Sequence, residues 1–266
     1  MAAFVSMYRG LGVTAGLDAG LARELAAHGE QLGYRSLWSN DEPAAPGLRT
    51  LAQFAAATTK VELGVGVLPL HRYQPAQIAE EIDRLGLDPA RLWLGIGSGA
   101  LSRQLDALQR AVAELRTLLP DTTGVMVAAM RPRLCRLGGA IADGVLLNWM
   151  LPAQAARARE WVREGAADQG RAAPVVASYV RVAIGAGARR RLRAEEGFYR
   201  TINEAHRRHF AGMDTPVGSV GIAASRRTEL LEALAEYHCA LDLPIVRVLA
   251  APDASSLRDA TRAAAP

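Results

Sequence analysis

Two adjacent acids, Asp41 and Glu42, directly follow a short apolar segment, and a carboxylate in such a position can accept or donate a proton. His71 and Arg72 follow a second apolar segment in the same way, and they could exchange a proton or hold an anion. Titratable groups are otherwise sparse at the ends of the apolar segments. This sparseness suits a bound cofactor that supplies the reactivity while the protein positions it.

The segment "GIGSGA", Gly95 to Ala100, could bring a ring or a phosphate close to the backbone, because glycine has no side chain to hold a ligand away. The same glycines could instead form only a tight turn between a strand and a helix. The segment lacks the spacing of a full dinucleotide-binding fingerprint. It also places Ser98 one residue outside the frame of a G-x-S-x-G nucleophile elbow.

A phosphate site is suggested by "AAMRPRL", Ala128 to Leu134, where Pro132 is typical of a first helical turn. Free N–H groups at such a helix start can bind a phosphate, assisted by Arg131 or Arg133. Ordinary helix capping is the alternative interpretation of this segment.

Other chemistries find little support. Lys60 is the only lysine and precedes a predicted strand, so it would lie at the end of the fold opposite a Schiff-base site. The pair His206 and His209 lacks nearby acids, which does not favour a metal site. The net charge of +4 comes from dispersed arginines, which argues against nucleic-acid binding. No apolar run approaches the roughly 20 residues of a membrane span, and we expect a cytoplasmic protein.

Short apolar runs alternate with amphipathic segments over the whole chain, which predicts parallel strands and helices in a single domain, residues 1–266. The predicted strands are Phe4–Tyr8, Ser36–Asn40, Glu62–Leu68, Arg91–Gly97, Gly124–Ala129, Gly144–Asn148, Val175–Ile184 and Pro244–Leu249. The predicted helices are Leu17–Leu32, Leu48–Thr58, Pro75–Leu85, Leu101–Leu118, Pro132–Ala142, Pro152–Gln169, Arg189–Ala211, Arg226–Leu241 and Ala254–Ala264. This repetition favours an α/β fold of the (β/α)8 TIM-barrel type over an open doubly wound sheet.

Active sites of such barrels lie at the carboxyl ends of the strands. The predicted strand ends carry Tyr8, Arg9, Gly10, Asn40, Asp41, Glu42, Leu68 to Arg72, Gly97 to Gly99, Ala129, Met130, Arg131, Asn148, Trp149, Arg181 and Arg247.

Four blocks in this order resemble the bacterial luciferase-like superfamily. They are "GYRSLWSNDEP" (Gly33 to Pro43), "LAQFAAATTKVELGVGVLPLHRYQPAQIAEEI" (Leu51 to Ile82), "RLWLGIGSGA" (Arg91 to Ala100) and "AAMRPRLCRLGGAIADGVLLNWMLP" (Ala128 to Pro152). Within the superfamily the chain is most similar to the actinobacterial branch that uses the deazaflavin coenzyme F420. The resemblance is weakest after about Arg189.

The resemblance implies a TIM barrel in which a cis peptide bond in the third strand, here Gly66–Val67, forms a bulge behind the flavin or deazaflavin ring. It also implies that the glycines of "GIGSG" approach the cofactor and that Ala128–Arg133 lie near its tail phosphate. The cofactor-binding residues expected on this basis are Asn40, Gly66, Val67, Gly97, Ser98, Gly99, Ala129, Met130, Arg131 and Arg133. A homodimer is the assembly that the resemblance implies.

Three features depart from the family pattern. The second strand ends in Asp41-Glu42 where many relatives have Asp-His, and Arg131-Pro132 stands where relatives often have Gly-Pro. An arginine there could pair with a phosphate or fill the space that the phosphate needs. The usual insertion after the fourth strand is reduced, which predicts a shallower lid.

We therefore expect an F420-dependent oxidoreductase that passes a hydride between the deazaflavin and a small organic substrate. Glu42 is the predicted proton carrier, with Asp41 or Asn40 polarising the ring. The residues expected on the substrate side are Tyr8, His71, Asn148, Trp149 and Arg181, with barrel-mouth packing as the alternative for the tryptophan. An FMN-dependent monooxygenase and a non-catalytic cofactor-binding or partner barrel are the competing hypotheses.

Overall fold

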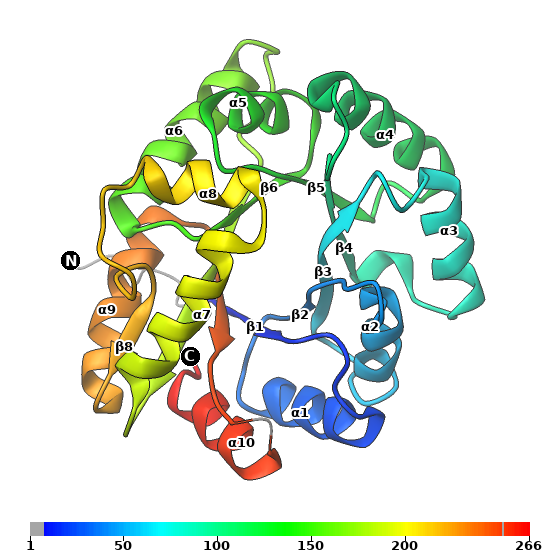
Figure 1. Ribbon diagram of the computed structural model, residues 1–266. Helices are drawn as coiled ribbons and strands as arrows, with labels where there is room; N and C mark the ends of the chain where they lie inside the picture. Colours follow the sequence, from blue (N-terminus) through cyan, green and yellow to red (C-terminus); the bar gives the residue numbers. More distant parts are fainter. Residues whose placement is uncertain (1–7, 252) are drawn as a thin grey trace, which may run out of the picture.

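Eight parallel strands close into a barrel surrounded by helices in the computed structural model, which describes residues 8–251 and 253–266 (Figure 1). Each strand pairs with the next along the chain from β1 to β7, and β9 closes the ring by pairing with both β7 and β1. The predicted TIM barrel is thus confirmed. We call the end of the barrel at the carboxyl ends of the strands the mouth.

The strands are β1 (Gly10–Val13), β2 (Ser36–Ser39), β3 (Glu62–Pro69), β4 (Leu92–Gly97), β5 (Gly124–Ala128), β6 (Gly144–Asn148), β7 (Val175–Ile184), β8 (Ile222–Ala224) and β9 (Leu243–Val248). The helices are α1 (Ala19–Gln31), α2 (Gly47–Ala55), α3 (Pro75–Arg84), α4 (Gln104–Leu118), α5 (Pro132–Ile141), α6 (Pro152–Ala167), α7 (Ala188–Ile202), α8 (Glu204–Ala211), α9 (Arg227–Ala240) and α10 (Ala254–Ala263), with a short 3-10 turn at Pro89–Arg91. None of the helices in the described part of the chain has the length and apolar character that crossing a membrane requires.

The first strand was predicted in the wrong place. Residues 4–7 of the predicted strand Phe4–Tyr8 lie outside the described residues, and β1 is the later segment "GLGV". Tyr8 therefore precedes the strand and lies at the end opposite the mouth, 54% exposed, with the Arg35 guanidinium 5.3 Å from its ring centre. Aromatic and β-branched composition favoured the earlier segment, whereas two glycines weaken the strand signal of the true one.

Arg9 and Gly10, predicted at the mouth with Tyr8, also belong to the opposite end of the barrel. The buried Arg9 side chain donates hydrogen bonds from Nη1 to the carbonyl oxygens of Ala264 (2.9 Å) and Ala265 (3.2 Å). It therefore ties the last residues of the chain to the base of the barrel.

The region after β7 departs from the predicted single helix Arg189–Ala211. The helix is interrupted at Asn203, whose side chain accepts a hydrogen bond from the His206 N–H (2.9 Å) and so caps α8. The unpredicted strand β8 has only three residues and pairs with the upper part of β7, Val182–Ile184. In Figure 1, α7 and α8 cross in front of the barrel, so part of the mouth is covered by this region.

The described residues form three apolar clusters, of which the two largest hold the barrel together and the third joins Trp149 to the region after β7. The larger core packs the outward strand faces against the helices, and the smaller one fills the barrel interior. The interior core consists of Trp38, Met126, Leu146, Ala177, Tyr179, Leu243 and Ile245, with Val67, Trp93 and Val175 packed against it.

Gly64 in β3 is required by the interior core. A Cβ atom at this position would lie 2.3 Å from atoms of the Trp38 indole, which is completely buried. Real Cβ atoms do not approach other heavy atoms so closely, and the surrounding core leaves the indole no open space to move into.

We predict that Gly64→Ala lowers the free energy of unfolding by about 1–3 kcal/mol, because the added methyl group overpacks the barrel interior. Gly197→Ala is the matched control, since Gly197 lies within α7 and the nearest atom to its added Cβ would be 3.7 Å away. The control should be neutral or slightly stabilising because alanine favours the helix. Urea denaturation of both variants measures the difference, and equal stabilities would contradict the packing argument.

Candidate functional site

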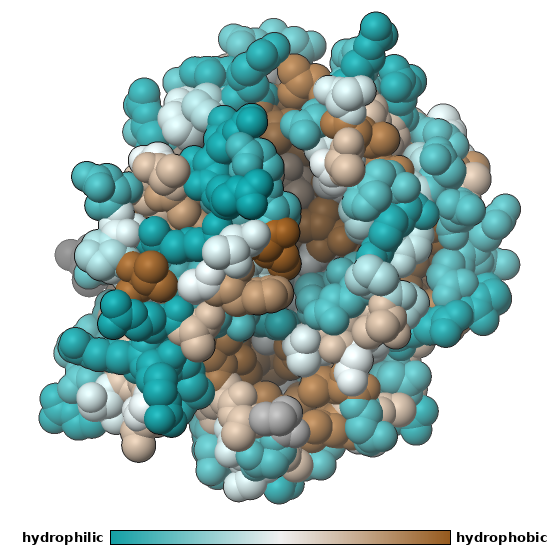
Figure 2. All heavy atoms as spheres, in the orientation of Figure 1, coloured by the Kyte–Doolittle hydropathy of each residue, from teal (hydrophilic) through white to brown (hydrophobic). Residues whose placement is uncertain are grey.

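The carboxyl ends of β2 to β7 gather most of the predicted site residues around one mouth. In chain order they are Asn40, Asp41, Glu42, Gly66, Val67, His71, Gly97, Ser98, Gly99, Ala129, Met130, Arg131, Arg133, Asn148, Trp149 and Arg181. Tyr8 is not among them because it precedes β1. The space-filling view of Figure 2 shows this face hollowed on either side of the ridge made by α7 and α8, with hydrophobic residues in the hollows.

A bulge in β3 forms one wall of the mouth. The Gly66–Val67 peptide bond is cis, as predicted, and the pairing of β3 with β4 shifts between Gly66 and Leu68. Val67 is partly exposed although most of β3 is buried. The bulge therefore turns this side chain toward the open end of the barrel interior.

The glycines of β4 allow its backbone to pack closely against the bulge. A Cβ atom at Gly95 would lie 2.8 Å from the Val65 carbonyl oxygen, and one at Gly97 would lie 2.7 Å from Val67 Cγ1. Gly99 has a φ of +58°, which favours glycine, and an added Cβ would meet the His71 ring at 1.9 Å. Tight packing and turn formation thus account for these glycines without a ligand.

His71 is an exposed rim residue that joins the loops after β3 and β4. Its Nδ1 atom lies 3.4 Å from the Ala100 N–H, from which it accepts a long hydrogen bond. The imidazole therefore covers the Gly99 turn.

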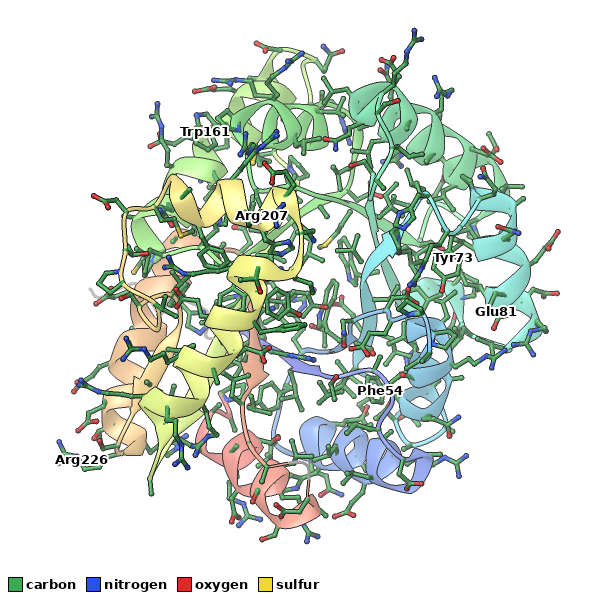
Figure 3. All side chains as sticks on the ribbon, viewed as in Figure 1. Phe54, Tyr73, Glu81, Trp161, Arg207 and Arg226 are labelled. Atoms are coloured by element: carbon green, nitrogen blue, oxygen red, sulfur yellow. The ribbon has the colours of Figure 1, made fainter. Side chains whose placement is uncertain are left out.

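Asp41 is held firmly in the wall. Its carboxylate is fully buried, forms an ion pair with Arg72, and accepts hydrogen bonds from the Gly47 N–H (2.8 Å) and the Tyr73 hydroxyl (3.1 Å). Figure 3 shows Tyr73 near the end of β3. Because both carboxylate oxygens are occupied, Asp41 positions α2 and Arg72 and is poorly placed to carry a proton.

Glu42 is exposed at the same rim and is oriented by Asn40. The Asn40 Oδ1 atom accepts a hydrogen bond from the Ala15 N–H (2.7 Å), so its Nδ2 atom is the group that donates to Glu42 Oε1 (2.7 Å). The second Glu42 oxygen has no hydrogen-bond partner among the described residues. Of the two adjacent acids, Glu42 is thus the one available for proton transfer.

The start of α5 presents unpaired backbone N–H groups beside arginine. Arg131 occupies the N-cap position without a side-chain capping hydrogen bond, and both Arg131 and Arg133 are exposed. A helix start with this charge can bind an anion such as a phosphate.

Trp149 is a packing residue of the mouth, with an exposure of only 1%. Its ring contacts Phe210 at a centroid distance of 5.5 Å, and the Arg181 guanidinium lies 4.0 Å from its ring centre. The Asn148 side chain accepts a hydrogen bond from Arg181. Trp149 therefore packs at the barrel mouth, which was the alternative to a substrate-side role. This packing holds the guanidinium group of Arg181 in place.

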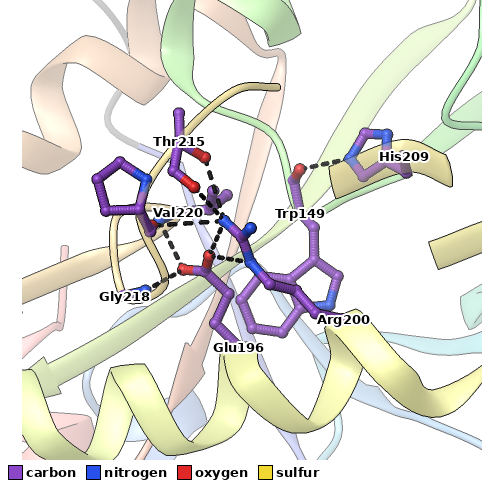
Figure 4. Close-up of polar contacts among 8 residues, drawn as sticks. Trp149, Glu196, Arg200, His209, Thr215, Gly218 and Val220 are labelled. Carbon is purple, nitrogen blue, oxygen red and sulfur yellow. Dashed lines mark hydrogen bonds and ion pairs between the residues drawn. The ribbon is translucent and has the colours of Figure 1, made fainter. Parts of the chain in front are cut away.

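A buried ion pair fixes the region that covers the mouth (Figure 4). The Glu196 carboxylate is fully buried, pairs with Arg200 at 2.7 Å and accepts hydrogen bonds from the N–H groups of Gly218 (3.0 Å) and Val220 (2.9 Å). The Arg200 side chain also donates to the Thr215 carbonyl oxygen (2.8 Å). Sequence reasoning missed this pair because "ARRRLRAEEGFYR" has the appearance of a solvated helix.

Tyr179 was also missed, and it forms the floor of the mouth. Its hydroxyl crosses the interior from β7 and lies 3.3 Å from the Gly66 carbonyl oxygen and 3.4 Å from the Ser39 carbonyl oxygen. Burial raises the pKa of Tyr179, so it stays a neutral hydrogen-bond donor. The alternation "AxYxR" in β7, which places Ala177, Tyr179 and Arg181 on one strand face, was the available signal.

A cavity of about 470 Å³ lies between β1, β9, α7 and α10. Its size suits a small-molecule ligand. The cavity is lined by Val13, Thr14, Leu17, Arg191, Ala194, Glu195, Arg247, Val248, Leu249, Ala250 and Leu257. Among the described residues, no cluster of His, Cys, Asp and Glu side chains could hold a metal ion.

Comparison with known proteins gives the same fold. Residues 2–119 match the family model described as luciferase-like monooxygenase. A stretch of 122 residues is 29% identical to the uncharacterized protein YceB of Bacillus subtilis (strain 168), and this match covers 41% of the chain and 37% of that relative.

Solved structures superimpose over nearly the whole chain at low identity. An F420-dependent secondary alcohol dehydrogenase in complex with an F420–acetone adduct has a TM-score of 0.76 and 17% identity, covering 97% of this chain and 99% of its own. The oxygenating constituent of 3,6-diketocamphane monooxygenase from Pseudomonas putida, in complex with FMN, has a TM-score of 0.69 and 14% identity, covering 97% of each chain. The closed barrel makes the chain a TIM barrel, and its residues 2–119 are similar to the luciferase-like monooxygenase family.

Proposed function

We propose that the protein is an F420-dependent oxidoreductase whose cofactor ring lies in the mouth against the β3 bulge. The observation that carries this proposal is the partly exposed Val67 above the floor made by Tyr179. A flat ring can rest on these two groups without displacing a buried side chain. The similarity in fold to an F420-dependent alcohol dehydrogenase supports the deazaflavin, whereas the similarity to an FMN-containing monooxygenase keeps FMN as the second candidate.

Different residues of the mouth would bind the cofactor and transfer the proton. When bound, the deazaflavin would supply the hydride chemistry. Val67 would support the ring from behind, and the start of α5 with Arg131 would hold the tail phosphate. Glu42, oriented by Asn40, would give or take the proton that accompanies the hydride on the substrate.

We predict that the purified protein perturbs the absorbance spectrum of F420 in a saturable manner and that FMN binds more weakly, if at all. Titration of each cofactor followed by difference spectroscopy measures both affinities. Tighter binding of FMN would favour the monooxygenase. Binding of neither cofactor would overturn both enzyme hypotheses and leave the non-catalytic barrel.

Glu42→Gln should lower turnover by about 10²–10⁴-fold, because glutamine keeps the hydrogen bond from Asn40 but cannot exchange a proton. The affinity for the cofactor should stay unchanged, which separates the proton step from binding. Steady-state and single-turnover rates measure the effect. Asp41→Asn serves as the comparison, since it should instead destabilise the rim by weakening the ion pair with Arg72. Unaltered turnover in Glu42→Gln would remove the acid–base assignment.

Arg131→Ala should weaken F420 binding by about tenfold, because it removes a charge-assisted hydrogen bond to the tail phosphate. The phosphate-free deazaflavin chromophore should bind both forms equally well. Arg163→Ala on α6 is the control, because Arg163 is likewise exposed and lies away from the mouth. An equal loss for the phosphate-free chromophore, or no loss at all, would contradict the phosphate assignment.

A further inference from the structure

Arg181 and Arg247 face the barrel interior side by side. They are direct partners in the pairing of β7 with β9. In each strand the residues two positions earlier, Tyr179 and Ile245, belong to the interior core. Because alternate residues of a strand share a face, both guanidinium side chains project into the interior one layer above that core.

The two guanidinium groups have no direct ion-pair partner among the described residues, and Glu195 acts on Arg181 only through space. Arg181 is 4% exposed, and its Nε atom is buried without a hydrogen-bond partner, as is the Nη1 atom of Arg247. Neither arginine takes part in any of the ion pairs among residues 8–251 and 253–266. By contrast, Arg191 in the same region donates to the carbonyl oxygens of Leu249 (2.9 Å), Ala186 (2.7 Å) and Ile184 (2.6 Å).

Aromatic contacts and one amide hold Arg181 in place without cancelling its charge. The ring centres of Trp149 and Tyr199 lie 4.0 and 5.0 Å from its guanidinium carbon, and Asn148 accepts one of its hydrogen bonds. Burial lowers the pKa of Arg181 and the neighbouring Arg247 adds to this effect, whereas Tyr199 and Glu195 oppose it. A buried charge of this kind is costly unless an opposite charge or further hydrogen bonds compensate for it.

The arginines lie across the interior from the bulge. In the eight-strand ring β7 is four strands away from β3 in both directions, so Arg181 and Val67 belong to opposite walls. The Tyr179 hydroxyl spans this distance directly below, to the Gly66 carbonyl oxygen. A ring resting on Val67 would therefore turn its free face toward the two arginines.

Arg247 is one of the residues that line the cavity of about 470 Å³, and the lining is mostly apolar. Leu17, Leu249 and Leu257 supply apolar walls, and Glu195 is the only acid among the described residues of the lining. A molecule that fills this cavity with an apolar body can direct an anionic group toward Arg247 and the adjacent Arg181.

We propose that Arg181 and Arg247 bind the carboxylate of an organic-acid substrate whose apolar part occupies this cavity. The identification of this acid as the substrate rests on the proposed oxidoreductase function. The pairing supplies the direct anionic partner that both arginines lack, and two planar guanidinium groups suit the two oxygens of a carboxylate. The alternative source of the anion, a charged group of the cofactor itself, is separated by the experiment.

Hexanoate and its neutral counterpart hexanamide are suitable probes, because they differ mainly in the charge of the head group. Isothermal titration of the full chain, with and without F420, should show at least tenfold tighter binding of hexanoate. Arg247→Gln should weaken hexanoate binding by about tenfold to a hundredfold and leave hexanamide binding unchanged. Arg110→Gln on α4 removes the same charge from an exposed position and should match the wild type.

Equal binding of hexanoate and hexanamide by the wild type would overturn the proposal, whether or not the variants fold. So would an Arg247→Gln protein that keeps the preference for hexanoate, or one whose F420 affinity falls as far as its hexanoate affinity. Arg181→Lys should give an intermediate loss, because lysine keeps the charge without the planar fork. If the preference for hexanoate is present and F420 does not bind, the anion site stands and the proposed function fails.

Discussion

The floor of the barrel mouth depends on large aromatic side chains that fill the interior below it. Each of these rings packs against a glycine, where any side chain would clash with it. The Trp38 indole occupies the space that a Gly64 side chain would need, and the Trp93 indole does the same at Gly124. Tyr179 closes the top of this packing by reaching across to β3. Above Tyr179 the inward positions of β7 and β9 change from apolar to arginine, so the same alternation that fills the core also sets the level at which a polar site begins.

Adjacent residues on the rim have different roles because the chain turns sharply after β2. The Asp41 side chain points into the wall, where Arg72 and the Gly47 N–H saturate it, and Glu42 remains in solvent with one oxygen free. The Asn40 side chain connects the loop after β1 to Glu42, since its amide accepts a hydrogen bond from the Ala15 N–H and donates one to the Glu42 carboxylate. The placement of the exposed Glu42 carboxylate thus depends on the half-buried amide of Asn40, which does not titrate.

The sequence predicted the parts of the fold that have strong local signals. Continuous apolar runs located β2 to β7, and the resemblance of four blocks to the luciferase-like superfamily located the bulge at Gly66–Val67, which the structure contains. The strand β1 was misplaced because glycines weaken its local pattern, and β8 is too short to have one. The chemistry of the interior was harder to predict, because Arg181 and Arg247 become neighbours only when strands far apart in the sequence pair.

The cover of the mouth and the buried charge form one continuous set of contacts through Trp149. The His209 Nε2 atom lies 2.7 Å from the Trp149 carbonyl oxygen, and because a carbonyl can only accept, Nε2 carries the hydrogen. Burial lowers the pKa of His209, so the ring stays neutral and α8 holds the end of β6 without adding charge. The indole of Trp149 in turn lies against Arg181, whose position therefore depends on the same helix that covers the mouth.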